Sequence, residues 1–283
     1  METATLLTQV VNGLSLASIL ILIALGLSVI FGLLGVINLA HADLFMAGMY
    51  IVVLAQGITG SFWLGVVAAP VLVGVIGLVV ELGVVRWLRA RPLDTLLATL
   101  GVGIVIREGV KLLFGAGYRQ VANPLPGSVA FGPVAYPIYR LLLIAVTAAI
   151  LGLLAAWLYR SAPGLRLRAM LQDRETAATY GIDPDRASLF AFVVGSALAG
   201  LAGALISPLV TVGPDVGIIY LARAFMVVVV GGVGSLLGLV AGGVVIGGGD
   251  TLAGYFLNPT IANAAVLVLA VVILRFRPGG LFR

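Results

Sequence analysis

Long apolar stretches alternate with short polar connections along almost the whole chain. The apolar stretches cover residues 9–34, 62–85, 93–114, 140–159, 188–210, 218–249 and 261–274, and a shorter one covers 44–56. A run of about 20 apolar residues is long enough for a helix to cross the hydrocarbon layer of a bilayer. The pattern lacks the alternating segments of about ten residues that are typical of membrane barrels. It therefore predicts an all-α polytopic membrane protein with a single transmembrane domain over residues 1–283.

The composition agrees with this pattern. Hydrophobic residues make up 61% of the chain and charged residues 10%, whereas a soluble domain has about 45–50% and about 25%. There is no cysteine, which excludes disulfides and thiolate metal sites. The net charge is +5, but basic residues in a membrane protein first report its orientation. We therefore do not expect nucleic acid as a partner.

Basic residues gather in three connections, which indicates their side of the membrane. These residues are Arg86, Arg89, Arg91, Arg160, Arg166, Arg168, Arg174, Arg186, Arg275, Arg277 and Arg283. The positive-inside rule places all three connections, and with them the C-terminus, in the cytoplasm. Three apolar stretches separate the last two groups, and an odd number of crossings cannot return the chain to the same side. One of these stretches must therefore be double or re-entrant.

The stretch 218–249 is the one we expect to break. Its 32 residues would form a helix of about 48 Å, too long for one crossing. Its centre reads "GGVGSLLG" over residues 231–238, and glycine both weakens a helix and permits tight turns. With this break we expect about eight spans. The side of the N-terminus stays open, because it depends on whether 44–56 crosses completely.

A polar cluster interrupts the first apolar region in "GVINLAHADLFMAGMY", residues 35–50. We interpret it as a helix break in which Asn38 and His41 lie at the end of one helix and Asp43 caps the next. Polar side chains are needed where backbone hydrogen bonds are released inside a bilayer. Interrupted helices in both halves of a transporter also point to the solute pathway. The candidate pathway residues are Asn38, His41, Asp43, Pro208, Pro214, Gly231, Gly232 and Gly234.

Other intramembrane features have simpler interpretations. We expect Arg107, Glu108 and Lys111 to anchor one helix near the interface, with an ion pair between Glu108 and Lys111. A role in the solute pathway is the alternative for these residues. We expect Glu81 to form an interfacial ion pair with Arg86. Small residues four apart, as in Gly195, Ala199 and Gly203 and in Gly234, Gly238 and Gly242, predict close helix packing. Either strip could instead face a partner or a pathway.

Catalytic motifs are missing from the sequence. Lys111 is the only lysine and does not stand in a phosphate-binding glycine loop, and His41 is the only histidine. A metal site built on histidines and the common hydrolase motifs are therefore excluded. We expect no cofactor, no metal, no catalytic residue and no ATP hydrolysis by this chain itself.

The longest polar connection, residues 160–187, predicts a short surface helix over 165–179 that ends before Gly181 and Pro184. Its stretch "ETAATYG" (175–181) resembles the Glu-Ala-Ala-x3-Gly loop of ABC importer permeases, with Thr176 in place of the first alanine. The resemblance implies a coupling helix that docks on an ATP-binding subunit. The residues that it assigns to this coupling loop are Arg174, Glu175, Ala177, Gly181 and Asp183.

Further stretches resemble the inner-membrane permeases of the branched-chain amino acid importer family, whose relatives carry urea and short-chain amides. They are residues 13–50, "RPLDTLLATLGVGIVI" (91–106), the loop above, "AFMVVVVGGVGSLLGLVAGG" (224–243) and "RPGGLF" (277–282). The resemblance implies two cytoplasmic ATP-binding subunits that use ATP, a second homologous permease and an extracytoplasmic solute-binding protein. Branched-chain amino acids and urea or amides both stay open as solutes. Two other classes of protein stay open as alternatives to an importer permease. One is a secondary transporter or channel that acts alone, and the other is a membrane enzyme.

Overall fold

The computed structural model describes residues 2–35, 37–89, 91–131 and 134–282, and helices dominate them. The helices are α1 (Glu2–Leu34), α2 (His41–Thr59), α3 (Phe62–Val80), α4 (Arg86–Leu88), α5 (Pro92–Phe114), α6 (Ile138–Arg160), α7 (Ala162–Gln172), α8 (Arg174–Thr179), α9 (Pro184–Ile206), α10 (Val216–Gly231), α11 (Leu236–Phe256) and α12 (Pro259–Phe276). A π-helical turn, Glu81–Val85, joins α3 to α4. A 3-10 turn, Ser207–Leu209, follows α9.

Six helical segments of the described chain are long and apolar enough to cross a membrane. They are Thr8–Gly32, His41–Thr59, Phe62–Leu88, Ile138–Arg160, Pro184–Leu209 and Leu236–Phe256. Two shorter apolar helices cover Val216–Gly231 and Thr260–Phe276. The helix α5 has 23 residues, but Asp94, Arg107, Glu108 and Lys111 interrupt its apolar sequence. The protein is thus an all-α polytopic membrane protein.

Most predicted boundaries agree with the structure, and the break in 218–249 is confirmed. There α10 ends at Gly231 and α11 begins at Leu236. Two details differ. The connection 160–187 forms two helices instead of one, because Asp173 leaves the helical conformation and starts α8. A short antiparallel hairpin, β1 (Ser128–Phe131) with β2 (Val134–Pro137), lies between α5 and α6 and was not predicted.

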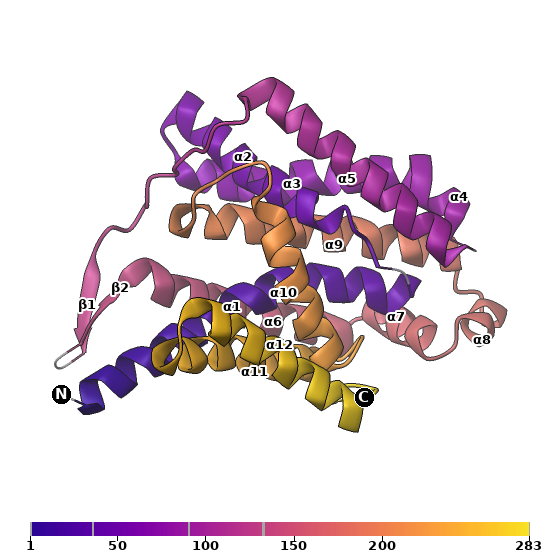
Figure 1. Cartoon of the computed structure of the whole chain (residues 1–283). Coiled ribbons are helices and arrows are strands. Elements are labelled where there is room, and N and C mark those ends of the chain that lie inside the picture. The colour runs from indigo at the N-terminus through magenta and orange to yellow at the C-terminus, as the bar shows by residue number, and fades with distance from the viewer. Residues whose placement is uncertain (1, 36, 90, 132–133, 283) are drawn as a thin grey trace.

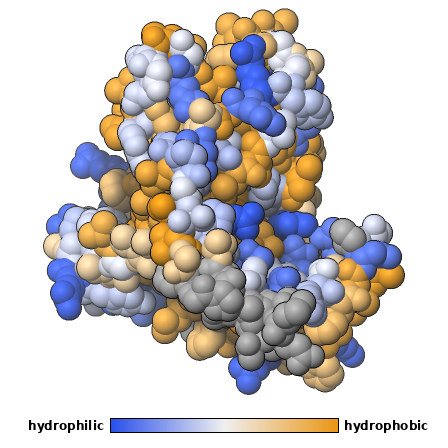
Figure 2. All heavy atoms as spheres, turned by 90° about the vertical axis from the view of Figure 1, so that its left-hand side faces the viewer, coloured by the Kyte–Doolittle hydropathy of each residue, from blue (hydrophilic) through white to orange (hydrophobic). Residues whose placement is uncertain are grey.

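The bundle has two distinct ends (Figure 1). The hairpin end carries β1 and β2 and the start of α1, where the Tyr136 hydroxyl donates to the Val11 carbonyl oxygen at 3.1 Å. The arginine-rich end carries α4, α7, α8 and the C-terminus. Figure 2 views the hairpin end and shows hydrophilic residues spread over it, with hydrophobic residues along much of its outline. The three basic connections therefore lie at one end of the protein, as predicted.

Small residues let the central helices approach closely. The segments within α1, α2 and α9 are the most buried of the six. A Cβ added at Gly26 of α1 would meet the backbone of Gly195 and Ala199 in α9, and one at Gly203 of α9 would meet the Phe45 carbonyl. The strip Gly195, Ala199 and Gly203 thus packs inside the bundle, as expected. Gly234 differs, because it lies in the turn before α11 and faces open space.

The two halves of the chain repeat one arrangement in opposite directions, since α1 and α9 run in opposite senses along the bundle (Figure 1). The set α1, α2, α3 and α5 corresponds in order to α9, α10, α11 and α12. Serine caps α3 and α11 alike, since Ser61 accepts from the Leu64 amide and Ser235 from the Gly238 amide. Proline begins both α5 and α12. The pairs α1 with α11 and α3 with α9 are the most extensively packed. Inverted repeats of this kind are common in transporters.

Candidate functional site

The chain between α1 and α2 is held by polar side chains inside the bundle. Helix α1 ends at Leu34, Gly35 has a φ of 65°, and residues 37–40 are not helical. The Asn38 side-chain oxygen accepts from the Ala40 amide at 3.1 Å, and the Leu39 amide donates to the Thr99 hydroxyl of α5 at 3.2 Å. These bonds satisfy amides that the helix break releases. The predicted break is confirmed, with Asn38 buried in it.

His41 attaches the start of α2 to the middle of α1. Its ring is fully buried, and Nε2 lies 3.1 Å from the Ile23 carbonyl oxygen. A carbonyl only accepts, so this contact assigns the proton to Nε2. Within the described residues Nδ1 has no partner. The prediction that His41 ends the preceding helix is wrong, because it is the first residue of α2.

Asp43 does not cap α2, which corrects a second prediction. It lies in the first turn of α2, and its carboxylate accepts from Arg107 of α5 at two points. Arg107 Nε lies 2.9 Å from Oδ1, and Nη2 lies 3.1 Å from Oδ2. The Asp43 side chain is 3% exposed and that of Arg107 is 16% exposed. Planar guanidinium groups match carboxylates in this two-point geometry.

A second carboxylate approaches the same arginine from the other half of the chain. Asp215, just before α10, lies 4.0 Å from Arg107 and 3.8 Å from Lys111. Lys111 also pairs with Glu108 at 2.9 Å, so this predicted ion pair is confirmed. The anchoring role expected for Arg107 is wrong, since it points inward to Asp43. We call Asn38, His41, Asp43, Arg107 and Asp215 the polar centre.

Glycine makes the contact between α2 and α5 possible. A Cβ at Gly103 would collide with the Asp43 carboxylate and approach Ala40. Thr99, Gly103 and Arg107 lie four residues apart, so they share one face of α5. This face was not predicted, although the sequence has a threonine, a glycine and an arginine at helical spacing within an apolar stretch.

The candidates of the second half separate into two places. Pro208 lies in the 3-10 turn after α9. Pro214 is buried in the segment that leads to Asp215. In this segment Val212 forms an antiparallel bridge with Arg119: the Arg119 amide donates to the Val212 carbonyl at 2.8 Å, and the Val212 amide donates to the Arg119 carbonyl at 2.9 Å. This segment meets the polar centre, because a Cβ at Gly217 would strike the Ala42 backbone.

The glycine turn between α10 and α11 lies elsewhere, at the arginine-rich end. Gly232 and Gly234 have φ values of 109° and 79°. The C-terminal segment covers this turn, since the Leu281 amide donates to the Val230 carbonyl at 2.8 Å and the Phe282 amide to the Gly231 carbonyl at 3.0 Å. The structure therefore does not bring Gly231, Gly232 and Gly234 together with the polar centre.

The connection 160–187 presents a capped helix at the arginine-rich end. Asp173 accepts from the Glu175 and Thr176 amides at 3.0 Å and from the Thr176 hydroxyl at 2.6 Å, and so begins α8. These bonds, the hydroxyl foremost, lower the pKa of Asp173 below its usual value. Ala177 is buried, whereas Glu175 is exposed. The side chain of Arg174 lies outside the part of the chain that the structure describes.

Gly181 and Asp183 connect this helix to α9. Gly181 has a φ of 81°, and its amide donates to the Ala178 carbonyl at 3.0 Å, which ends α8. Asp183 accepts from the Asp185 and Arg186 amides at 2.9 and 3.2 Å and begins α9. The bond from the Arg186 amide is the main reason why the pKa of Asp183 is lowered. All the residues that the resemblance assigns to the coupling loop therefore lie in α8 or in the short connection from α8 to α9.

A membrane-spanning bundle with inverted halves, broken helices and buried charges is the architecture of a transporter. The family model for the branched-chain amino acid transport system permease component matches residues 9–275. The chain belongs to this family of ABC importer permeases.

Curated relatives agree with the family. The high-affinity branched-chain amino acid transport system permease protein BraD of Pseudomonas aeruginosa is 28% identical, over 97% of this chain and 95% of BraD. The corresponding permease protein LivH of Escherichia coli K12 is 29% identical, over 97% of this chain and 94% of LivH. LivM of the same organism is 26% identical, over 78% of this chain and 58% of LivM. No solved structure matches the chain.

Proposed function

We propose that this chain is a permease subunit of a binding-protein-dependent ABC importer that carries branched-chain amino acids across the inner membrane. The match of the family model to residues 9–275 carries this proposal. The names of the relatives favour amino acids over urea, since BraD and LivH are branched-chain amino acid permeases.

The charges of the polar centre fit the same solute class. An amino acid carries a carboxylate and an ammonium group, and the polar centre offers a guanidinium on Arg107 and carboxylates on Asp43 and Asp215. Urea has no charge, so it would gain less from these groups. Helix breaks such as those before α2 and α10 are typical of transporter pathways.

ATP hydrolysis belongs to partner subunits in this proposal. The exposed surface of α8 with Glu175 and Tyr180 would meet a cytoplasmic ATP-binding subunit. The arginine-rich end, including the C-terminus, would then face the cytoplasm, in agreement with the positive-inside rule. The hairpin end would receive solute from an extracytoplasmic binding protein. A second permease completes the pathway, and the likeness to both LivH and LivM supports a related pair of chains.

Uptake into proteoliposomes tests this function. The chain is reconstituted with the ATP-binding, permease and binding proteins encoded beside it, and labelled leucine, valine and urea are offered with and without enclosed ATP. We expect ATP-dependent uptake of leucine and valine. Uptake of urea but not of leucine or valine would show that the importer carries urea instead of branched-chain amino acids. Uptake without ATP or partners would favour a secondary transporter or channel.

A further inference from the structure

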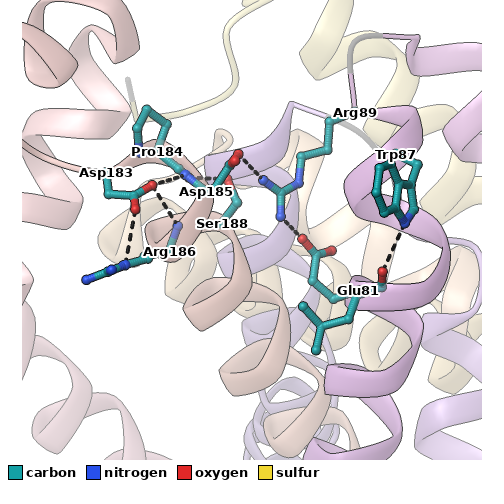
Figure 3. A network of polar contacts seen from close by, with 9 residues as sticks. Glu81, Trp87, Arg89, Asp183, Pro184, Asp185, Arg186 and Ser188 are labelled. Atoms are coloured by element: carbon teal, nitrogen blue, oxygen red, sulfur yellow. Dashed lines mark hydrogen bonds and ion pairs between the residues drawn. The ribbon is translucent and has the colours of Figure 1, made fainter.

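Arg89 joins the coupling loop to the membrane helices through two carboxylates. One guanidinium nitrogen, Nη2, donates to Glu81 at the beginning of the π-helical turn after α3. The other, Nη1, donates to Asp185 in the first turn of α9 at 2.7 Å. Figure 3 shows Arg89 pointing between these two residues. The expected pair between Glu81 and Arg86 is therefore wrong.

The two contacts of Arg89 differ in burial. The Glu81 side chain is completely buried, that of Arg89 is 10% exposed, and that of Asp185 is 58% exposed. Within the described residues, Oε2 of Glu81 has no partner. A buried carboxylate needs a paired cation, so Glu81 keeps Arg89 at this position. Asp185 can separate from Arg89 at small cost, because exposed ion pairs contribute only about 0–1 kcal/mol.

The surroundings of Arg89 connect to three membrane elements. A narrow cavity beside it is lined by Val85, Thr95, Thr99, Phe192 and Asn38 of the polar centre, among others. The Thr95 hydroxyl of α5 donates to the Leu88 carbonyl at 2.7 Å and so holds α4 to α5. A displacement of Arg89 would thus reach α3, α5 and the break before α2.

The π-helical turn Glu81–Val85 is the point in this region where the helix conformation can change. Turns with the wider π pattern are frequent at functional sites within helices. Glu81 begins this turn, and Asp185 directly follows Asp183 and Pro184 at the end of the coupling loop. The contact thus joins an irregular helix turn to the first turn of α9, where the coupling loop ends.

We infer that Arg89 transmits movement of the coupling loop into the membrane helices, with Asp185 as the contact on the loop side and Glu81 as the contact in the membrane. The inference rests on the proposed function, since it needs a loop that ATP-binding subunits move. Arg89 acts here as a positioning residue and touches no solute.

Asp185→Asn is the discriminating variant, because it removes the negative charge that attracts Arg89 on the loop side and leaves the buried pair of Glu81 and Arg89 intact. Solute uptake and ATP hydrolysis are measured together in proteoliposomes that contain the complete importer. We expect hydrolysis to continue while solute uptake per ATP falls about tenfold, a size typical of coupling between linked sites. Asp185→Glu keeps a carboxylate and should restore the ratio.

Asp94→Asn is the matched control, because it removes the exposed ion pair of Arg91 and Asp94 beside the same connection. Its ratio of uptake to hydrolysis should equal that of the unchanged protein. An unchanged ratio in Asp185→Asn would overturn the inference while the importer remains established. Uptake without ATP by the unchanged protein would overturn the proposed function and the inference with it.

Spin labels provide a readout that does not depend on solute. The distance between a label on α8 and one on α4 is measured with and without ATP. In the unchanged protein we expect the two labels to move together, so that ATP does not alter the distance between them. In Asp185→Asn we expect ATP to alter this distance, because the labels move independently. A distance that ATP leaves constant in both proteins would contradict a role for Arg89 in transmission.

Discussion

Asp43 and Arg107 join α2 and α5 through two parallel hydrogen bonds of 2.9 and 3.1 Å. The two residues are 64 positions apart in the chain. Their contact holds the first turn of α2, directly after the helix break, against α5. It also holds Arg107 of α5 4.0 Å from Asp215, which belongs to the second half of the chain.

Asp43→Asn should destabilise the protein, because it leaves Arg107 without its buried partner. Breaking a buried ion pair costs about 3–5 kcal/mol, and the partial exposure of Arg107 puts the expected loss near the lower limit. SDS-induced unfolding of the purified protein in mild detergent measures it. Glu108→Gln removes an exposed pair and should cost less than about 1 kcal/mol. Equal losses in both variants would contradict the structural role of the pair.

Gly203→Ala should separate α2 from α9. The added Cβ would collide with the Phe45 carbonyl, and overpacking of this kind costs about 1–3 kcal/mol. Gly152→Ala in α6 is the control, since no atom lies within 4 Å of its added Cβ. There the higher helix propensity of alanine should raise stability by up to about 1 kcal/mol. Thermal unfolding in detergent should therefore shift in opposite directions for the two variants.

Gly181→Arg should leave the protein in the membrane but abolish uptake driven by ATP. Gly181 has a φ of 81°, and Gly60 at the hairpin end has a φ of 72°; neither has an atom within 4 Å of an added Cβ. Both substitutions should therefore have the same backbone cost, about 1–2 kcal/mol. Gly60→Arg is thus a matched control that should retain uptake. Normal ATP-driven uptake by Gly181→Arg would contradict docking at this loop.

The start of α8 should weaken in acid. The pKa of Asp173 is lowered from its ordinary value of 3.8 by hydrogen bonds from Thr176 and the backbone. A lowered folded-state pKa means that the stabilisation is complete above the ordinary value and disappears as pH falls through the lowered one. Hydrogen exchange of the Glu175 and Thr176 amides, corrected for intrinsic rates, should accelerate over this range. Asp173→Asn has no titrating group and should remove this dependence.

The sequence predicted the elements better than their partners. Gly231, Gly232 and Gly234 indicated the break before α11, because glycine permits the positive φ values found there. The polar residues from Asn38 to Asp43 indicated the break before α2. In both cases the residues that break the helix lie at the break itself, so a short stretch of sequence is enough to predict it.

Long-range contacts were not predictable in the same way. A carboxylate in the first helical turn suggests a cap, and only the packing of α5 through Gly103 turns Asp43 toward Arg107. The same holds for Glu81, whose partner is Arg89 and not the nearer Arg86. The sequence offers several arginines or lysines as partners for each carboxylate. Only the tertiary fold determines which of them comes close enough to form the ion pair.

The meeting of α2 and α10 has an electrostatic consequence. Both helices begin inside the bundle, where Gly217 lies against Ala42. Each helix start has the positive end of a dipole, equivalent to about half an elementary charge. Asp43 and Asp215 stand at these two starts and offset them, while Arg107 contributes a full positive charge nearby. A zwitterion that enters this region adds no net charge, whereas an ion adds a full unit to a nearly balanced set of charges.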